Sequence, residues 1–458
     1  MYKNLDKYWT ETFLQLSMAL PLAVSFLAEM AMNITNNLII ARLGSLELAA
    51  LGISGGLLFG FLYICLNLVS MVNVKVAEAY GRDDHESMAH ITRQGLVLSL
   101  LIAIPSIILG WHMDKVLIFF GQKSDVALLG KSYMQSAVWV FIPYMWFFIL
   151  RGLVVTLNKG RIVLFITLIA IGLNFIANYM LVYGKWGMPM MGVSGSGLAT
   201  TLICWGMFIA LGLYIYVSKN FKHYYVFQNL KKIDWPLCWD LFYLGLPVAG
   251  MILVEMGIFY AVALTMGYIG TNELAATQIV MNYMTTIFMI PIAFTHMVSI
   301  RVATNLATKS FNEIKLSATL ALIFVGSFML IAAFITYCYA ANIPLLYLDP
   351  LKGDQVKVIE LAASFLAVCA IFQFFDGLQV VAGGCLRGLK DTKIPFLAAS
   401  FGYWVIGFPL GWVLCFWLGY GSLGIWWGLA AGLFITSLLL VYRFYHKVFL
   451  MEKSNFNL

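Results

Sequence analysis

Residues 20–40 read LPLAVSFLAEMAMNITNNLII, and residues 246–266 read LPVAGMILVEMGIFYAVALTM. A shift of 226 positions aligns the Leu-Pro pair that begins each stretch and brings Glu29 onto Glu255. Each copy is a run of apolar residues around one acid. An ionisable side chain in hydrocarbon costs at least about 2.5 kcal/mol, so such a residue by default marks an ion or substrate path. The repeat predicts a duplicated membrane protein with an acid in equivalent helices.

The composition supports a membrane protein. Of the 458 residues, 62% are hydrophobic and 11% are charged, whereas soluble domains carry about 25% charged residues. Continuous apolar runs of about 20 residues predict membrane-spanning helices and exclude a β-barrel, whose strands alternate. We predict an all-α fold of about twelve transmembrane helices, at residues 13–40, 48–74, 95–117, 132–157, 162–184, 194–218, 241–268, 273–300, 316–342, 359–385, 394–418 and 422–446.

The repeat places six helices in each half, so both halves have the same orientation in the membrane. We predict an N-lobe at residues 1–222, a basic cytoplasmic linker at 223–238 and a C-lobe at 239–458. With a cytoplasmic N-terminus, 21 of the 28 Lys and Arg residues lie on the cytoplasmic side, which fits the positive-inside rule. The expected location is the bacterial inner membrane, with both termini in the cytoplasm. The net charge of +7 then reflects orientation, and no nucleic-acid partner is expected. The linker is expected either to contact anionic membrane lipids or to be solvated.

Polar residues in the first half form a stripe. Glu29, Asn33 and Asn36 share one helical face through steps of four and three residues. Asn174 and Asn178 are four residues apart in a later span. We predict an N-lobe proton or substrate site from these five residues. The alternatives are that the asparagines only bridge helices and that Glu29 stays protonated, bonded to a backbone carbonyl of a neighbouring helix.

The second half contains two acids within apolar spans, Glu255 and Asp376. Two carboxylates in a low-dielectric cavity cannot both be charged without a counter-ion, so one binds a proton or a cation lies between them. This predicts a coupling-cation site, with Na⁺ as a possible metal ligand. Aligning the Phe-Phe pairs of the two halves places Ile149 opposite Asp376, so the first half has no acid equivalent to Asp376. Four further residues are predicted to support the C-lobe cavity: Gln278, Asn282, Phe372 and Gln379.

No enzyme motif is present in the sequence. It has no nucleotide-binding loop, no GxSxG and no HExxH. The seven cysteines are scattered without metal-ligand spacing. We therefore expect neither an enzyme nor a cofactor, and only a coupling ion, H⁺ or Na⁺.

Three segments resemble one transporter family. FFDGLQVVAGGCLRGLKDTKIP at 374–395, LVEMGIF at 253–259 and NFIANYMLVYG at 174–184 are similar to the multidrug and toxic compound extrusion (MATE) family, NorM-like branch. The resemblance implies a monomeric secondary transporter with a V-shaped central cavity that expels amphipathic organic cations against H⁺ or Na⁺. It also implies that the family's coupling-cation site is at Glu255 and Asp376.

The chain departs from the family pattern at two positions. Asn36 stands where many relatives have Asp, and Phe372 stands where NorM-like members often have Tyr. The first departure removes a carboxylate from the N-lobe, although Glu29 could substitute for it. The second removes a hydroxyl that could ligate Na⁺ and therefore tilts the expectation towards H⁺.

Two other functions are compatible with a duplicated membrane protein. A lipid-linked oligosaccharide flippase should have a basic cavity for pyrophosphate, but Arg151 is the only basic residue deep in an expected span. A channel needs oligomeric pore rings or a filter motif, and the sequence shows neither.

Overall fold

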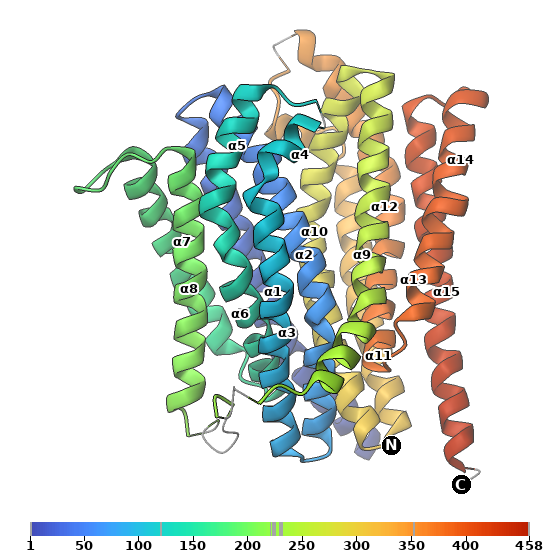
Figure 1. The fold of residues 1–458 in the computed structure, drawn as a ribbon. Coiled ribbons are helices and arrows are strands. Elements are labelled where there is room, and N and C mark those ends of the chain that lie inside the picture. The colour runs from blue at the N-terminus through green and yellow to red at the C-terminus, as the bar shows by residue number, and fades with distance from the viewer. Residues whose placement is uncertain are drawn as a thin grey trace. The chain divides into compact units, whose positions relative to one another are not determined.

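The computed structural model describes residues 2–119, 121–219, 221, 226–228, 232–350 and 353–456. All regular secondary structure in these residues is helical (Figure 1). Much of the predicted linker, residues 223–225 and 229–231, lies outside the described residues.

The described residues of the first half form eight α-helices and one 3₁₀ turn. Their bounds are α1 Tyr2–Ala41, α2 Ser45–Gly81, α3 His85–Trp111, α4 Met113–Phe119, α5 Ser124–Ala137, η1 Val138–Val140, α6 Phe141–Thr156, α7 Arg161–Tyr183 and α8 Val193–Val217.

The described residues of the second half form α-helices, one 3₁₀ turn (η3) and two π-helical stretches (η4 and η5). Their bounds are α9 Trp235–Ile269, α10 Thr271–Ala307, α11 Phe311–Cys338, η3 Ile343–Leu346, α12 Gly353–Gly388, α13 Lys393–Ser400, η4 Phe401–Gly407, α14 Phe408–Trp412, η5 Val413–Trp417 and α15 Ser422–Phe456.

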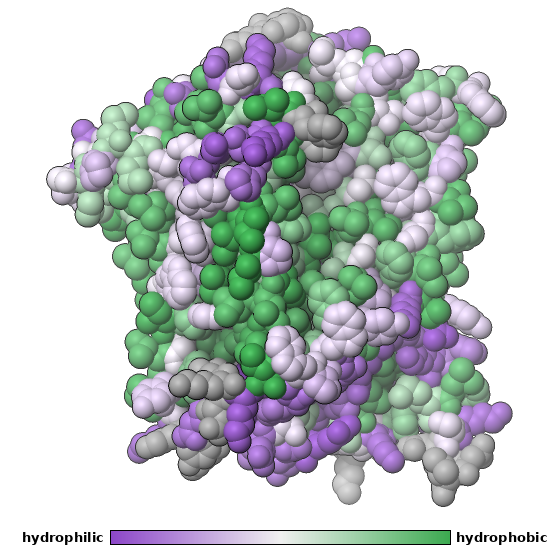
Figure 2. Space-filling view, in the orientation of Figure 1, coloured by the Kyte–Doolittle hydropathy of each residue, from purple (hydrophilic) through white to green (hydrophobic). Residues whose placement is uncertain are grey.

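Twelve helical segments of the described chain are long and apolar enough to cross a membrane, so the predicted all-α fold with about twelve spans is confirmed. On the face shown in Figure 2, apolar residues cover most of the middle, and hydrophilic residues gather towards the upper and lower edges. Local chemistry sets those ends. The Asp84 side chain caps α3 by accepting from the Ser87 N–H at 2.9 Å. Gly184 ends α7 in the left-handed region, at φ 66°.

The structure differs from the predicted spans in three details. The helix predicted at 132–157 is two α-helices, α5 and α6, joined by the η1 turn. The span predicted at 394–418 contains the π-helical stretches η4 and η5, which hydropathy cannot distinguish from an α-helix. The short helix α4 was not predicted, because seven residues are too few to give a membrane-span pattern.

The contacts divide the chain into two units. Unit 1 contains Met1–Ala19 and Gly250–Leu458, and unit 2 contains Leu20–Ala249. Each boundary between the two units lies within a helix and close to a proline. The first is near Pro21 in α1, and the second is near Pro247 in α9. This division follows contacts, whereas the predicted lobes follow the sequence repeat, and those lobe boundaries stay a prediction.

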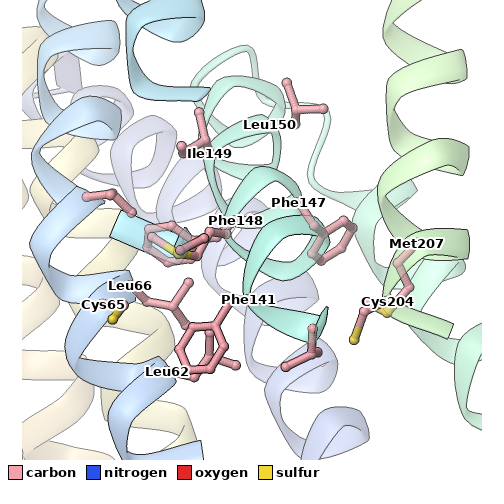
Figure 3. Close-up of a cluster of buried hydrophobic side chains, with 14 of the residues drawn as sticks. Leu62, Cys65, Leu66, Phe141, Phe147, Phe148, Ile149, Leu150, Cys204 and Met207 are labelled. Carbon is pink, nitrogen blue, oxygen red and sulfur yellow. The ribbon is translucent and has the colours of Figure 1, made fainter. Parts of the chain in front are cut away.

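The core of unit 2 is formed around α6. Figure 3 shows Phe147 directed towards Cys204 and Met207 of α8, while Leu66 lies on α2 at the other side of the helix. Ile149, in the same cluster, is 1% exposed. The residue opposite Asp376 in the repeat is therefore part of an apolar core.

Candidate ion-coupling site

The two acids of the second half lie in unit 1. Glu255 is half-buried on α9, and Asp376 is 6% exposed on α12. They are close enough to interact electrostatically. The Oδ1 atom of Asp376 is buried without a hydrogen-bond partner in the described chain, and the ion pairs described in unit 1 involve other carboxylates. The structure thus brings the predicted pair of acids within electrostatic range of each other, and no basic residue of the described chain forms an ion pair with either of them.

A tyrosine that the sequence did not point to lies beside these acids. Tyr403, fully buried in η4, donates its hydroxyl to Oε1 of Gln379 at 2.5 Å. Gln379 is one turn after Asp376 on α12, and its Nε2 is buried without a partner in the described residues. Tyr403 also interacts electrostatically with Glu255 and Asp376. The π-helical stretch η4 thus places the Tyr403 hydroxyl on Gln379, one helical turn from Asp376.

The other predicted support residues differ in their placement. Phe372 is 2% exposed and stacks on Trp426, with ring centroids 6.0 Å apart and planes at 10°. Its role in the structure is packing. Gln278 and Asn282 are exposed on α10, outside the buried Asp376–Gln379–Tyr403 group.

Glu29 has a basic partner. Arg151 of α6, 4% exposed, donates from Nη1 to Oε1 of Glu29 at 3.2 Å. Tyr144 donates its hydroxyl to Oε2 of Glu29 at 2.5 Å. Both carboxylate oxygens are therefore engaged by side chains, which is not the backbone-carbonyl contact considered as an alternative. The sequence analysis identified Arg151 as a basic residue deep in an expected span. It did not identify Glu29 as the partner of Arg151.

The asparagines form a separate cluster in unit 2. Asn178 of α7 donates to Oδ1 of Asn36 at 3.0 Å, and Asn36 donates to Thr200 of α8 at 3.2 Å. The Asn178 amide also donates to the backbone oxygen of Asn174 at 2.9 Å. Both side-chain atoms of Asn174 are buried without a partner in the described chain. Asn33 is half-buried on α1. The predicted stripe thus divides into an acid bound to α6 and one amide, that of Asn36, bound to α7 and α8.

Comparisons with known proteins give consistent results. A family model described as MatE matches residues 21–180 and 247–413. The "Probable multidrug resistance protein NorM" of Brucella suis biovar 1 (strain 1330) is 32% identical over 440 residues, covering 96% of this chain and 93% of the relative. The "Multidrug resistance protein NorM" of Burkholderia vietnamiensis is 34% identical over 438 residues, covering 94% of this chain and 93% of the relative.

Solved structures agree on the fold. A structure titled "Crystal structure of eukaryotic MATE transporter AtDTX14" superposes with a TM-score of 0.85 at 19% identity, covering 95% of this chain and 96% of that one. Another, titled "Crystal structure of MATE in complex with MaL6", gives 0.87 at 15% identity, covering 97% of each chain. The family match, the identities and this fold agree with the resemblance seen in the sequence, and the chain is a multi-pass membrane protein of the MatE family, similar throughout to its NorM members.

Proposed function

We propose that this protein is a secondary active multidrug exporter that antiports amphipathic organic cations against H⁺ or Na⁺ by alternating access. The observation that carries the proposal is the pair Glu255 and Asp376, two acids of unit 1 that interact electrostatically. Asp376 keeps one buried oxygen without a partner in the described residues. An uncompensated buried acid is unfavourable, so occupancy by a proton or a cation stabilises it.

The coupling follows from unequal binding. An ion shifts a conformational equilibrium only if it binds the two states with different affinity. Glu255 and Asp376 are on different helices, α9 and α12, so a change in helix packing changes their separation and their affinity for the ion. Na⁺ would use the carboxylate oxygens and a hydroxyl as ligands, and H⁺ would need one carboxylate only.

The relatives support the substrate class, because their names describe multidrug resistance. The partners of this chain are then organic cations and the surrounding membrane lipids, with the chain acting as a monomer. We place it in the bacterial inner membrane with both termini cytoplasmic. Catalysis and a resident cofactor are not part of the proposal.

The arrangement of Arg151 disfavours the flippase alternative. A pyrophosphate site needs free basic groups, but the guanidinium of Arg151 is bound to Glu29 at 3.2 Å. A phosphate would have to displace the partly buried Glu29 carboxylate, which would leave that carboxylate without its basic partner.

The test is ethidium efflux from proteoliposomes with independently imposed Na⁺ and pH gradients. We expect Asp376→Asn to abolish ion-driven efflux while the protein remains monodisperse in detergent, because the amide keeps the size and removes the ionisable group. Glu360→Gln is the matched control, since Glu360 is an exposed acid on the same helix. Wild-type efflux by Asp376→Asn under either gradient would show that the assigned site is wrong.

A further inference from the structure

The two repeats differ in how they neutralise the acid that they share. Glu29 and Glu255 are equivalent in the repeat. The alignment that places Ile149 opposite Asp376 also places Arg151 opposite Leu378. The second repeat therefore adds a second acid near its glutamate, whereas the first repeat has an apolar residue at that position and a base two residues later.

The surroundings of the Arg151 guanidinium are those of a cation site. Besides the Glu29 carboxylate, its central carbon lies 4.7 Å from the ring centroid of Phe26 and 5.2 Å from that of Phe148. Aromatic faces at such distances attract cations. The Tyr144 hydroxyl bonded to the other oxygen of Glu29 fixes the carboxylate. An acid, a hydroxyl and aromatic faces together suit a small organic cation.

We infer that Arg151 is a tethered cation that permanently occupies the first repeat's copy of the cation site, so that only the second repeat exchanges an ion. The inference rests on the proposed role of Glu255 and Asp376 in the second repeat. Glu29 needs neither a proton nor a free ion, because the guanidinium neutralises it in place. The Arg151 side chain is buried, at 5% exposed, and that of Glu29 is partly buried, at 16%.

The inference predicts that shortening Arg151 exposes a real binding site. Arg151→Ala removes the guanidinium but leaves Glu29 and the Tyr144 hydroxyl beside the faces of Phe26 and Phe148. This site should bind free guanidinium, the ion that has the same charge and shape as the group removed. A ligand that binds only the folded state raises its stability, and the gain grows with the logarithm of the ligand concentration above Kd.

The experiment is thermal unfolding of purified Arg151→Ala in detergent, with millimolar guanidinium chloride balanced by N-methylglucamine chloride. We expect a rise of several degrees in the melting temperature that grows with the guanidinium concentration. Wild type should show no such rise, because its site is filled, and neither should the Glu29→Gln/Arg151→Ala double variant, because its site has no acid. No rise in Arg151→Ala, or an equal rise in the double variant, would overturn the inference.

If Arg151→Ala is recovered only as aggregate, the readout becomes its monodisperse yield after solubilisation with each salt. Recovery with guanidinium alone supports the inference, and recovery with neither salt overturns it. Both readouts measure stability without transport. Their failure would leave the coupling role of Asp376 intact, and failure of the Asp376→Asn test would leave these readouts unaffected.

Discussion

Arg301 of α10 binds Glu11 of α1 through two contacts, with Nε 3.2 Å from Oε1 and Nη2 2.5 Å from Oε2. The shift of 226 positions aligns Lys75 of α2 with Arg301, and Lys75 forms an ion pair with Asp240 of α9. The second helix of each repeat therefore binds the amino-terminal part of the other repeat's first helix. This reciprocal exchange explains why contacts group Met1–Ala19 with the second half of the chain.

The two ion pairs should differ in their contribution to stability. The Glu11 side chain is 6% exposed and also accepts from Gln15 at 3.0 Å and Ser317 at 2.8 Å. Asp240 is 50% exposed. We expect Arg301→Met to cost about 3–5 kcal/mol, because it leaves a buried charge uncompensated, and Lys75→Met to cost about 1 kcal/mol or less.

Denaturant or thermal unfolding of the variants in detergent measures the difference. A Glu11→Gln/Arg301→Met double variant should recover most of the loss, because it removes both charges. Equal destabilisation by the two single substitutions would contradict the assigned burial.

Gly245 marks a close approach of two helices in unit 2. A Cβ atom added to Gly245 of α9 would lie 1.8 Å from the backbone oxygen of Leu68 of α2, so Gly245→Ala must separate the two helices. We expect a loss of at least about 1–3 kcal/mol, the usual cost of overpacking. Gly52→Ala in α2 is the control, because a Cβ there meets nothing within 4 Å. Alanine is the better helix former by about 1 kcal/mol, so unfolding should show stabilisation by Gly52→Ala and destabilisation by Gly245→Ala.

The chain leading into α9 is held by α3. The Asp234 carboxylate contacts Nε2 of His90 at 3.0 Å and accepts from the Leu237 N–H at 3.1 Å, while its backbone N–H donates to Gln94 at 3.0 Å. The His90 contact, followed by the Leu237 N–H, lowers the pKa of Asp234 below its ordinary value of 3.8. A carboxyl with a lowered pKa stabilises the folded state above its ordinary pKa, and this stabilisation is lost as the pH falls through the folded value.

Hydrogen exchange at the Leu237 N–H measures this effect. We expect its protection to stay constant from neutral pH down to about 4 and then to fall as Asp234 is protonated. Asp234→Asn cannot ionise, so its protection should not depend on pH in this range. A wild-type profile that matches this variant would mean that the contact does not stabilise the segment.

The sequence predicted the spans and the acids because both depend on strong local patterns. Apolar runs of about 20 residues identify helices whatever they pack against. Glu29, Glu255 and Asp376 were recognisable because a carboxylate in such a run is rare. Asn36 and Asn178, on different helices, were assigned to one site, and the structure joins them directly.

Partners across helices were not predictable, because they depend on helix rotation and crossing, which the sequence does not encode locally. The prediction treated Glu29 as a member of a stripe on its own helix, whereas its charge is balanced from α6 by Arg151. Nothing in the sequence marked Tyr403 as a site residue. The chain contains 23 tyrosines, so one more tyrosine in an apolar span is not unusual. Its position depends on the π-helical stretch η4.

Tyr403 provides the sharpest test of the coupling site beyond the acids themselves. Tyr403→Phe removes the donor to Oε1 of Gln379, whose Nε2 is already without a partner in the described chain. The unpaired buried amide should cost about 1–3 kcal/mol of stability. Because Gln379 is one turn from Asp376 on α12, the apparent affinity for the coupling ion should also fall by up to about tenfold, which corresponds to about 1.4 kcal/mol.

Tyr283→Phe is the matched control, since Tyr283 forms a comparable 2.9 Å hydroxyl bond with Thr336 in the same unit. Efflux is measured against Na⁺ concentration at fixed pH and against pH at fixed Na⁺ concentration. The comparison shows whether the Na⁺ dependence or the pH dependence of efflux changes in Tyr403→Phe. An ion response in Tyr403→Phe that matches both wild type and Tyr283→Phe would limit Tyr403 to packing.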